Sequence, residues 1–286
     1  MVTLADYKSD DIPAWCPGCG DFPILSAVKN ALVGLGKRPH EVLMVSGIGQ
    51  AAKLPHYLKC NTFNGLHGRA IPPAIAAKIA NHDLTVMVVG GDGDGYAEGG
   101  NHFVHVMRRN PDMTYLVHNN QIYGLTKGQT SPTSDAGFVT KTTPYGNIAS
   151  PENPLLIAIA CNCSFVARGF AGDAKHLTSL IKEAIAHKGF SLIDILQPCV
   201  TFNRVNTFSW YEKRVYKVEE EGDYDPYDRL AAFKKAQEWG DRIPIGIIYK
   251  EERPVYEEQI PALSKECLIK QKVDPLVFQS LLEEFR

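Results

Sequence analysis

The stretch LTVMVVGGDGDG, residues 84–95, joins a strand signal directly to a loop signal. Its first half, Leu84–Val89, is a nearly continuous apolar run rich in β-branched side chains, which is typical of a strand covered on both faces. Its second half, residues 90–95, alternates glycine with aspartate, so the strand ends abruptly in a flexible polar loop. Ligands in open parallel sheets bind at such carboxyl ends of strands.

Two later segments repeat this arrangement. Met113–Val117 is predicted to be a buried strand and runs into residues 118–120, His-Asn-Asn. Ser191–Leu196 is a third predicted strand and runs into residues 197–199, Gln-Pro-Cys. A helix is predicted between the first two strands, over Ala97–Arg109. This β-α-β-α-β order predicts the α/β class, with a parallel sheet flanked by helices.

Composition excludes several classes of protein. The 286 residues include 30 basic and 32 acidic side chains, so a formal net charge of −2 gives no case for nucleic-acid binding. The apolar runs are far shorter than the ~20 residues that cross a bilayer, and the N-terminus carries no secretion signal, so no membrane association is expected. Seven cysteines, an odd number, favour thiol or metal roles in a cytoplasmic protein over disulfides.

The loops after the first two strands suggest a cation site. Asp92 lies between two glycines, and the next strand ends in Asn119 and Asn120. A carboxylate and an amide oxygen from neighbouring strand ends can bind a hard divalent cation together with phosphate oxygens. The glycines let the backbone approach a diphosphate closely. Either loop alone would be read as a surface turn, but the pair favours a site.

This pair of loops resembles the thiamine-diphosphate pattern, GDG followed by NN. Further stretches resemble the beta subunits of 2-oxoacid:ferredoxin oxidoreductases, over roughly residues 12–255. These stretches are WCPGCG (15–20), GLHGRA (65–70), VVGGDGD (88–94), GGNHF (99–103), NNQIYGLTKGQTSPTS (119–134) and LQPCVTFN (196–203). The resemblance implies a thiamine-diphosphate-binding fold of the pyrophosphate-domain type over residues 1–206. Residues 207–286 are then a C-terminal extension that packs on this domain and on a partner chain.

The resemblance also implies which residues bind the cofactor. It places Mg²⁺ on Asp92, Asn120 and the backbone carbonyl of Ile122. The residues implied to contact thiamine diphosphate are Gly47, Ile48, Gly49, His67, Gly91, Asp92, Gly93, Asp94, Asn120, Ile122, Gly124, Leu125 and Thr126.

Two side chains are candidates for a catalytic role. By resemblance His67 lies against the cofactor, where an imidazole can donate a hydrogen bond or carry a proton. Lys53 lies at a position that faces the substrate in the family, where it would pair with the carboxylate of a 2-oxoacid. The alternatives are a structural histidine and a solvated lysine.

The cysteine pattern is less regular. Cys16 and Cys19 form a CxxC motif, which by itself could be a redox pair, half of a zinc site or half of an iron–sulfur site. The resemblance implies a 4Fe–4S cluster bound by Cys16, Cys19 and Cys199. Relatives often carry the remaining cysteine in SGIGC, whereas this chain has Gln50 there. We therefore predict Cys60 as the fourth ligand. A three-cysteine site with an open iron and a ligand from another chain are the alternatives.

The implied activity is the CoA-dependent oxidative decarboxylation of a 2-oxoacid, with release of CO₂ and transfer of electrons to ferredoxin. The preferred substrate is 2-oxoglutarate, followed by pyruvate or a broader range, and the reverse carboxylation is chemically feasible. The glutamate that activates the cofactor belongs to a pyrimidine-binding domain, so the resemblance implies an alpha subunit and a heterotetramer of two such pairs. Two other hypotheses are a non-redox thiamine-diphosphate decarboxylase half and a zinc-ribbon module on Cys16, Cys19, Cys60 and Cys199.

Overall fold

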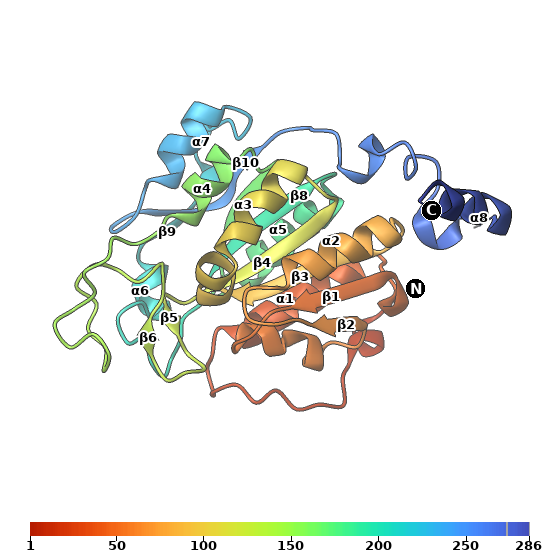
Figure 1. Ribbon diagram of the computed structural model, residues 1–286. Helices are drawn as coiled ribbons and strands as arrows, with labels where there is room; N and C mark the ends of the chain where they lie inside the picture. The colour runs from red at the N-terminus through yellow and green to blue at the C-terminus, as the bar shows by residue number, and fades with distance from the viewer. Residues whose placement is uncertain (273, 286) are drawn as a thin grey trace.

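An eight-stranded sheet forms the centre of the molecule (Figure 1). The structure, a computed structural model, describes residues 1–272 and 274–285. Across the sheet the strands follow the order β2-β1-β3-β4-β8-β7-β10-β9, and β5 and β6 form a separate hairpin. The strands are β1 (Val42–Ser46), β2 (Asn61–Asn64), β3 (Thr85–Gly91), β4 (Met113–Asn119), β5 (Ile122–Tyr123), β6 (Gln129–Thr130), β7 (Phe165–Phe170), β8 (Phe190–Leu196), β9 (Val215–Lys217) and β10 (Ile243–Lys250).

The sheet is mostly parallel. All the neighbouring pairs from β2 to β7 run in the same direction, which confirms the predicted α/β class. Strand β10 pairs antiparallel with β7, and β9 pairs parallel with β10. The carboxyl ends of the six parallel strands therefore lie at one edge, and their loops can meet there.

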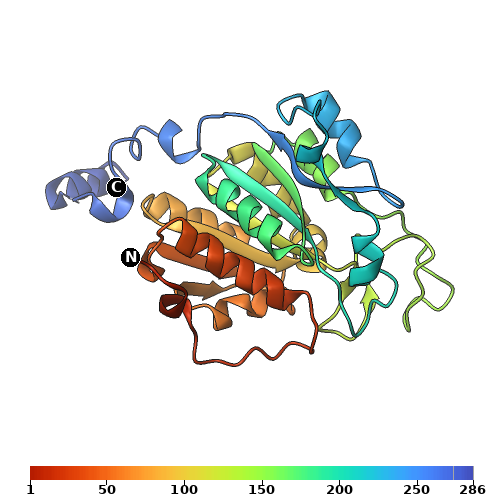
Figure 2. The same cartoon turned by 180° about the vertical axis from the view of Figure 1, so that it is seen from behind.

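Helices cover both faces of the sheet. They are α1 (Asp21–Gly34), α2 (Ile71–Ala80), α3 (Gly100–Arg109), α4 (Pro154–Ala160), α5 (Ala174–Ala186), α6 (Phe208–Glu212), α7 (Arg229–Ala236) and α8 (Pro275–Glu284). Helices α1 and α5 pack on one face, which Figure 2 shows, and α2, α3, α4 and α7 pack on the other. Alternate residues of β3 divide between the two cores: Met87 and Val89 face α1 and α5, while Val86 and Val88 face α2 and α3.

Some predicted boundaries differ from the structure. The predicted helix Ala97–Arg109 is a π-helical turn, Gly93–Glu98, followed by α3. Such turns often occur at functional sites, and this one begins directly after Asp92. Strand β2 was not predicted, because all four of its side chains are exposed and give no apolar signal.

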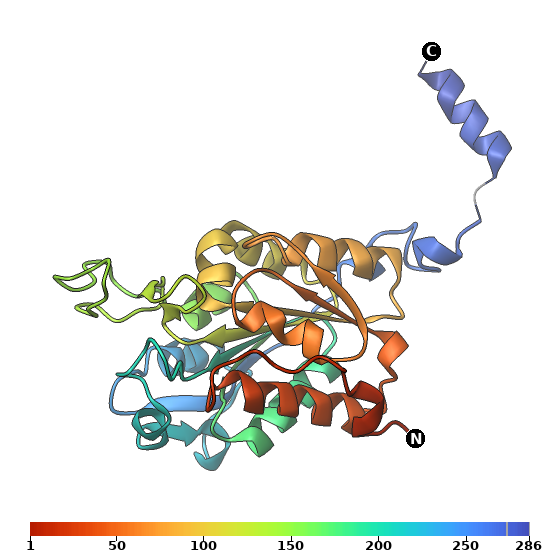
Figure 3. The same ribbon diagram turned by 90° about the horizontal axis from the view of Figure 1, so that it is seen from below.

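The C-terminal region is only partly an extension. The boundary expected at residue 206 falls between β8 and α6, yet the residues beyond it supply β9 and β10 to the main sheet. The chain then crosses the surface to α8, which projects away from the body (Figure 3). None of the residues Pro275–Glu284 is buried.

In the part of the chain that the structure describes, no helix combines the length and the apolar character needed to cross a bilayer.

Candidate active site

The loops at the carboxyl edge of the sheet surround one hollow. It lies between the loops that follow β1, β2, β3 and β4. Of the residues implied to contact the cofactor, all except Gly47 line it. Gly47 lies directly behind, because a Cβ built there would be 2.0 Å from Oδ2 of Asp94. The hollow is also lined by Gln50, Ala51 and Tyr123.

Asp92 is held in a fixed orientation at the base of this hollow. It is 1% exposed, and its Oδ2 accepts hydrogen bonds from the hydroxyls of Ser131 at 2.5 Å and Thr133 at 2.6 Å. Burial raises the pKa of this carboxyl to about 6. Both of these side-chain bonds use Oδ2, so Oδ1 is available to a cation. Ser131 and Thr133 were not predicted from sequence, although the hydroxyl-rich run QTSPTS follows the Asn-Asn pair.

A buried polar network supports Asp92 from behind. The Thr133 hydroxyl also lies 2.9 Å from Oδ1 of Asn119, whose Nδ2 donates to Oδ1 of Asp194 at 3.1 Å. The same Asp194 oxygen accepts from the Tyr96 hydroxyl at 2.8 Å, and Nε of Arg168 lies 3.8 Å from its Oδ2. Burying such a charged pair costs free energy, and ordered polar partners offset that cost.

Asn120 is fixed by bonds at both ends of its side-chain amide. Its Oδ1 accepts from the backbone N–H of Ile122 at 3.1 Å, and its Nδ2 donates to Oε1 of Gln197 at 2.8 Å. An amide oxygen has two lone pairs, so Oδ1 keeps one acceptor site for a cation. Together with Asp92, this donor set of hard oxygens fits Mg²⁺ and a diphosphate.

Asp94 connects two loops that border the hollow. Its Oδ1 accepts from the backbone N–H of Ile48 at 2.9 Å and from that of Gly68 at 2.8 Å. Gly68 has φ +69°, and a Cβ there would be 2.3 Å from the backbone carbon of Glu98, so only glycine fits. Nε2 of His67 lies 3.6 Å from Oδ1 of Asp94 and 3.8 Å from Oε2 of Glu98, which places the imidazole at the rim.

Lys53 lies outside the hollow, unlike the other candidate for a catalytic role, His67. Lys53 lies in the 3-10 turn Ala51–Tyr57 and is partly exposed. Among residues 1–272 and 274–285 its ammonium forms no hydrogen bond or ion pair. An uncommitted ammonium one turn from the hollow is compatible with a role in substrate binding, which stays a prediction.

Three of the four cysteines predicted as ligands lie together beside this hollow. Cys16 and Cys19 precede α1, and the Cys19 N–H bonds to the Cys16 carbonyl at 3.0 Å. The Thr201 hydroxyl donates to the Cys16 sulfur at 3.0 Å, and Nε2 of Gln197 donates to the Cys19 sulfur at 3.3 Å. Burial raises the pKa of the Cys19 thiol, and the charges of Asp21 and of the nearby Cys199 act in the same direction.

Cys60 does not join them. It precedes Asn61, which pairs with Leu43 near the start of β1, so Cys60 lies at the amino edge of the sheet. Four inter-strand steps separate β2 from β8, roughly 19 Å at ~4.8 Å per step. Burial raises the pKa of the Cys60 thiol to about 12, and its sulfur donates to the Asn61 carbonyl at 3.3 Å. The prediction of Cys60 as the fourth ligand is therefore wrong, and so is a zinc ribbon that includes it.

The three thiols do not form a site for a single metal ion within the part of the chain that the structure describes. Among the residues that the structure describes, no three side chains of His, Cys, Asp or Glu are close enough to hold one metal ion. A four-iron cluster spreads its cysteines more widely, because each thiolate binds a different iron. Gln50 lies next to the loop that carries Cys16 and Cys19: its backbone carbonyl accepts a hydrogen bond from Nε1 of Trp15 at 2.9 Å. Its buried Oε1 has no hydrogen-bond partner among the described residues.

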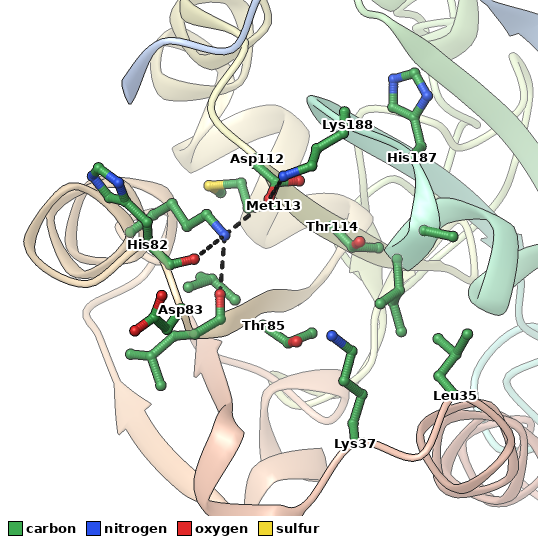
Figure 4. A pocket seen from close by; sticks show the side chains of 15 residues that line it. Leu35, Lys37, His82, Asp83, Thr85, Asp112, Met113, Thr114, His187 and Lys188 are labelled. Carbon is green, nitrogen blue, oxygen red and sulfur yellow. Dashed lines mark hydrogen bonds and ion pairs between the residues drawn. The ribbon is translucent and has the colours of Figure 1, made fainter. Parts of the chain in front are cut away.

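A second hollow, of about 440 Å³, lies at the amino edge of the sheet (Figure 4). Its central ammonium, Lys78, donates to the carbonyls of His82 and Leu84 at 3.0 Å each and pairs with Asp112 at 3.0 Å. Lys78 therefore stabilises the ends of α2 and β3, and none of the predicted site residues lines this hollow. The predicted cofactor-binding residues other than Gly47 line the hollow at the opposite edge.

Comparison with protein families agrees with this location. Residues 43–195 match the family described as "Thiamine pyrophosphate enzyme, C-terminal TPP binding domain". Residues 199–265 match a second family, described as the C-terminal part of the pyruvate ferredoxin oxidoreductase beta chain. The first match contains β2, β3, β4 and nearly all of β1, the strands whose loops surround the hollow.

Individual relatives cover most of the chain. The 2-oxoacid:ferredoxin oxidoreductase subunit beta of Saccharolobus solfataricus is 49% identical over 89% of this chain and 87% of its own. The 2-oxoglutarate synthase subunit KorB of Methanocaldococcus jannaschii is 34% identical over 91% and 96%. A solved structure, 2-oxoglutarate:ferredoxin oxidoreductase from Magnetococcus marinus with 2-oxoglutarate, coenzyme A and succinyl-CoA bound, matches with a TM-score of 0.90 and 40% identity over 98% of this chain and 96% of that chain.

Proposed function

Because the chain belongs to the family of 2-oxoacid:ferredoxin oxidoreductase beta subunits, we propose that it carries the cofactor and electron-exit sites of a two-chain enzyme. The complex catalyses the CoA-dependent oxidative decarboxylation of a 2-oxoacid, releases CO₂ and passes the electrons to ferredoxin. The preferred substrate is 2-oxoglutarate, which the bound molecules in the Magnetococcus marinus relative support. Pyruvate or a wider range of 2-oxoacids is the alternative, and the reverse reaction is a carboxylation.

One observation carries this proposal: two neighbouring sites share a hydrogen-bonding partner. We call Asp92, Asn120 and the Ile122 carbonyl the oxygen site, and Cys16, Cys19 and Cys199 the sulfur site. Gln197 bonds to Asn120 on one side and to Cys19 on the other. A non-redox decarboxylase would gain nothing from three thiols beside its cofactor. An enzyme that removes electrons one at a time needs a metal cluster at this short separation.

The chain's own residues would hold the cofactor by its diphosphate. Asp92, Asn120 and the Ile122 carbonyl would hold Mg²⁺, which would supply positive charge for the diphosphate. When bound, thiamine diphosphate supplies an electron sink for the bond to the leaving carboxylate. His67, at the rim beside Asp94, donates a hydrogen bond or carries a proton toward the reacting centre.

Lys53 gives a testable prediction about substrate binding. Lys53→Ala should raise the KM for the 2-oxoacid about tenfold or more, because a charge-assisted hydrogen bond to the carboxylate contributes ~1.5–3 kcal/mol. Steady-state kinetics with 2-oxoglutarate and with pyruvate measure this change. Lys59→Ala, at an exposed lysine in the same segment, is the matched control. Equal KM values in the Lys53 variant and the wild type would make Lys53 a surface residue.

A partner chain completes the site. The glutamate that activates the aminopyrimidine ring belongs, in the family, to a pyrimidine-binding domain on the alpha subunit. Large apolar side chains are exposed on the loops that surround the hollow: Leu66 is 75% exposed and Leu125 43%. In the long loop after β6, Tyr145 and Ile148 are each 99% exposed. Exposed apolar surface beside a site is typical of a subunit interface. We propose that this surface is covered by the alpha subunit and that two such pairs form a heterotetramer.

Cys16, Cys19 and Cys199 would bind a 4Fe–4S cluster. With Cys60 elsewhere, the described residues supply three thiolates, and the fourth iron is left open or takes a ligand from another chain. The resulting low-potential cluster would pass electrons to ferredoxin. The free state of all seven cysteines is compatible with a reducing, cytoplasmic location.

The proposal can be tested on the complex of this chain with its alpha subunit, purified without oxygen. We expect bound thiamine diphosphate, together with iron and acid-labile sulfide in amounts roughly equal to each other. We also expect a brown colour that bleaches when 2-oxoglutarate and CoA are added. A colourless complex that decarboxylates 2-oxoacids would instead support the non-redox alternative. Bleaching by pyruvate and CoA, but not by 2-oxoglutarate and CoA, would overturn the assigned substrate.

A further inference from the structure

The side chain of Gln197 bonds both to Asn120 of the predicted cation site and to Cys19 of the predicted cluster site. It follows β8 directly and is 1% exposed. Its Oε1 accepts from Nδ2 of Asn120 at 2.8 Å, and its Nε2 donates to the sulfur of Cys19 at 3.3 Å. The proposed roles of Asn120 and Cys19 assign nothing to the residue that joins them.

The orientation of this amide follows from its neighbours. At one end, the backbone N–H of Ile122 donates to Oδ1 of Asn120, so the Asn120 NH₂ group must face Gln197. At the other end, Nε2 of Gln197 also donates to the Pro198 carbonyl at 3.1 Å. A reversed Gln197 amide would place its oxygen against that carbonyl and its NH₂ against another NH₂. Backbone groups at both ends therefore fix the direction of the chain of bonds.

Packing also restrains Gln197. Its backbone N–H donates to the Asn119 carbonyl at 2.9 Å, and Gly20 packs directly against its side chain. A Cβ at Gly20 would lie 3.0 Å from both Cγ and Nε2 of Gln197. Glycine at position 20 thus allows the Gln197 amide to reach Cys19. Because this amide is held in place, it loses little conformational entropy when it bonds to Asn120 and Cys19.

We propose that Gln197 is a positioning residue that acts on both sites, an inference that rests on the proposed function. Its oxygen orients the Asn120 amide so that Oδ1 faces the cation. Its N–H bonds to the Cys19 sulfur and thereby raises the reduction potential of the metal group bound there. Hydrogen bonds to cluster sulfurs tune this potential, because they stabilise the form that carries more negative charge.

Two substitutions separate these effects. Gln197→Glu keeps an oxygen for Asn120 but replaces the N–H toward Cys19 with a carboxylate oxygen at pH 8. Gln197→Met keeps the length of the side chain and removes both bonds. We expect the dissociation constant of thiamine diphosphate to rise about tenfold in Gln197→Met, the cost of leaving the Asn120 NH₂ unsatisfied, and to stay within about twofold of wild type in Gln197→Glu. The midpoint potential should fall in both variants, and further in Gln197→Glu.

The experiment uses the intact complex with its alpha subunit. Thiamine diphosphate is titrated, at saturating Mg²⁺, into complex stripped of cofactor, and the midpoint potential is measured by redox titration with EPR detection. Ile195→Val, a buried change in β8, the strand that Gln197 follows, is the control for a loss of packing and should shift neither the dissociation constant nor the midpoint potential.

The outcomes distinguish the inference from the function on which it rests. Wild-type complex without iron, or without Mg²⁺-dependent binding of the cofactor, would overturn the proposed function. Wild-type complex with both, together with an unchanged potential in both Gln197 variants, would overturn the inference alone. If Gln197→Met fails to fold, an unchanged midpoint potential in Gln197→Glu is sufficient to overturn the inference.

Discussion

Replacing Asp92 with alanine is expected to weaken the Mg²⁺-dependent binding of thiamine diphosphate by roughly 100-fold or more and to abolish turnover. Asp92 is the only anionic group in the proposed ligand set, and the hydroxyls of Ser131 and Thr133 hold its carboxylate in place. Truncating one partner of a buried, hydrogen-bonded charge pair costs ~2–5 kcal/mol, because the remaining charge is left without compensation. Calorimetric titration of the complex with the cofactor at saturating Mg²⁺ measures the loss.

The fold of the Asp92 variant should survive. Burial raises the pKa of this carboxyl, so its charged form is costly in the absence of a cation, and alanine removes that cost. Asp135→Ala is the matched control, since Asp135 lies in the loop that carries Ser131 and Thr133 and accepts a hydrogen bond from Gln121 rather than from a predicted ligand. A Kd in Asp92→Ala equal to that of the control would place the cation elsewhere.

The second large effect is a loss of iron from the complex when a predicted cluster cysteine is replaced. Cys199→Ser should lose most of the iron of the complex, because iron–sulfur clusters bind thiolates far better than hydroxyls. Cys60→Ser should keep the wild-type iron content, since Cys60 lies at the other edge of the sheet with its thiol protonated. This pair of variants compares two partly buried cysteines of the same chain.

Iron and sulfide analysis of both complexes, with EPR after reduction, tests this expectation. Decarboxylation with an artificial acceptor that takes electrons directly from the cofactor should persist in Cys199→Ser, whereas ferredoxin reduction should fail. Loss of iron from Cys60→Ser together with full iron in Cys199→Ser would reverse the assignment and would require a rearrangement of β2.

Local patterns were sufficient to predict the framework and the location of the site. The apolar, β-branched run before Gly90 is typical of a strand buried on both faces, and the run from Met113 repeats it. Strands that alternate with helices form a parallel sheet, and a parallel sheet brings its carboxyl-end loops to one edge. Asp92 and Asn120 could therefore be placed together from sequence, and the structure places both on the same hollow.

The wrong prediction for Cys60 arose because no local pattern showed the position of this residue. Ten residues are long enough to return to the cysteine loop, so chain length alone permitted the assignment. Strand β2 decides otherwise: it pairs with β1 and begins near the start of that strand, at the amino edge. Its four exposed side chains give no apolar alternation, and without alternation neither the strand nor its register could be predicted from sequence.

The α/β class, the strand-end loops and the glycine, aspartate and asparagine residues on them could be predicted from local sequence, because they depend on the side chains of neighbouring residues. The contacts between distant groups depend on the folded chain: Ser131 and Thr133 contact Asp92, Asp194 lies behind Asn119, and Gln197 lies between Asn120 and Cys19. Residues 19 and 197 are brought into contact by the order of the strands and the packing of α1 against the sheet. That order minimises the free energy of the whole core, so no local pattern along the chain encodes it.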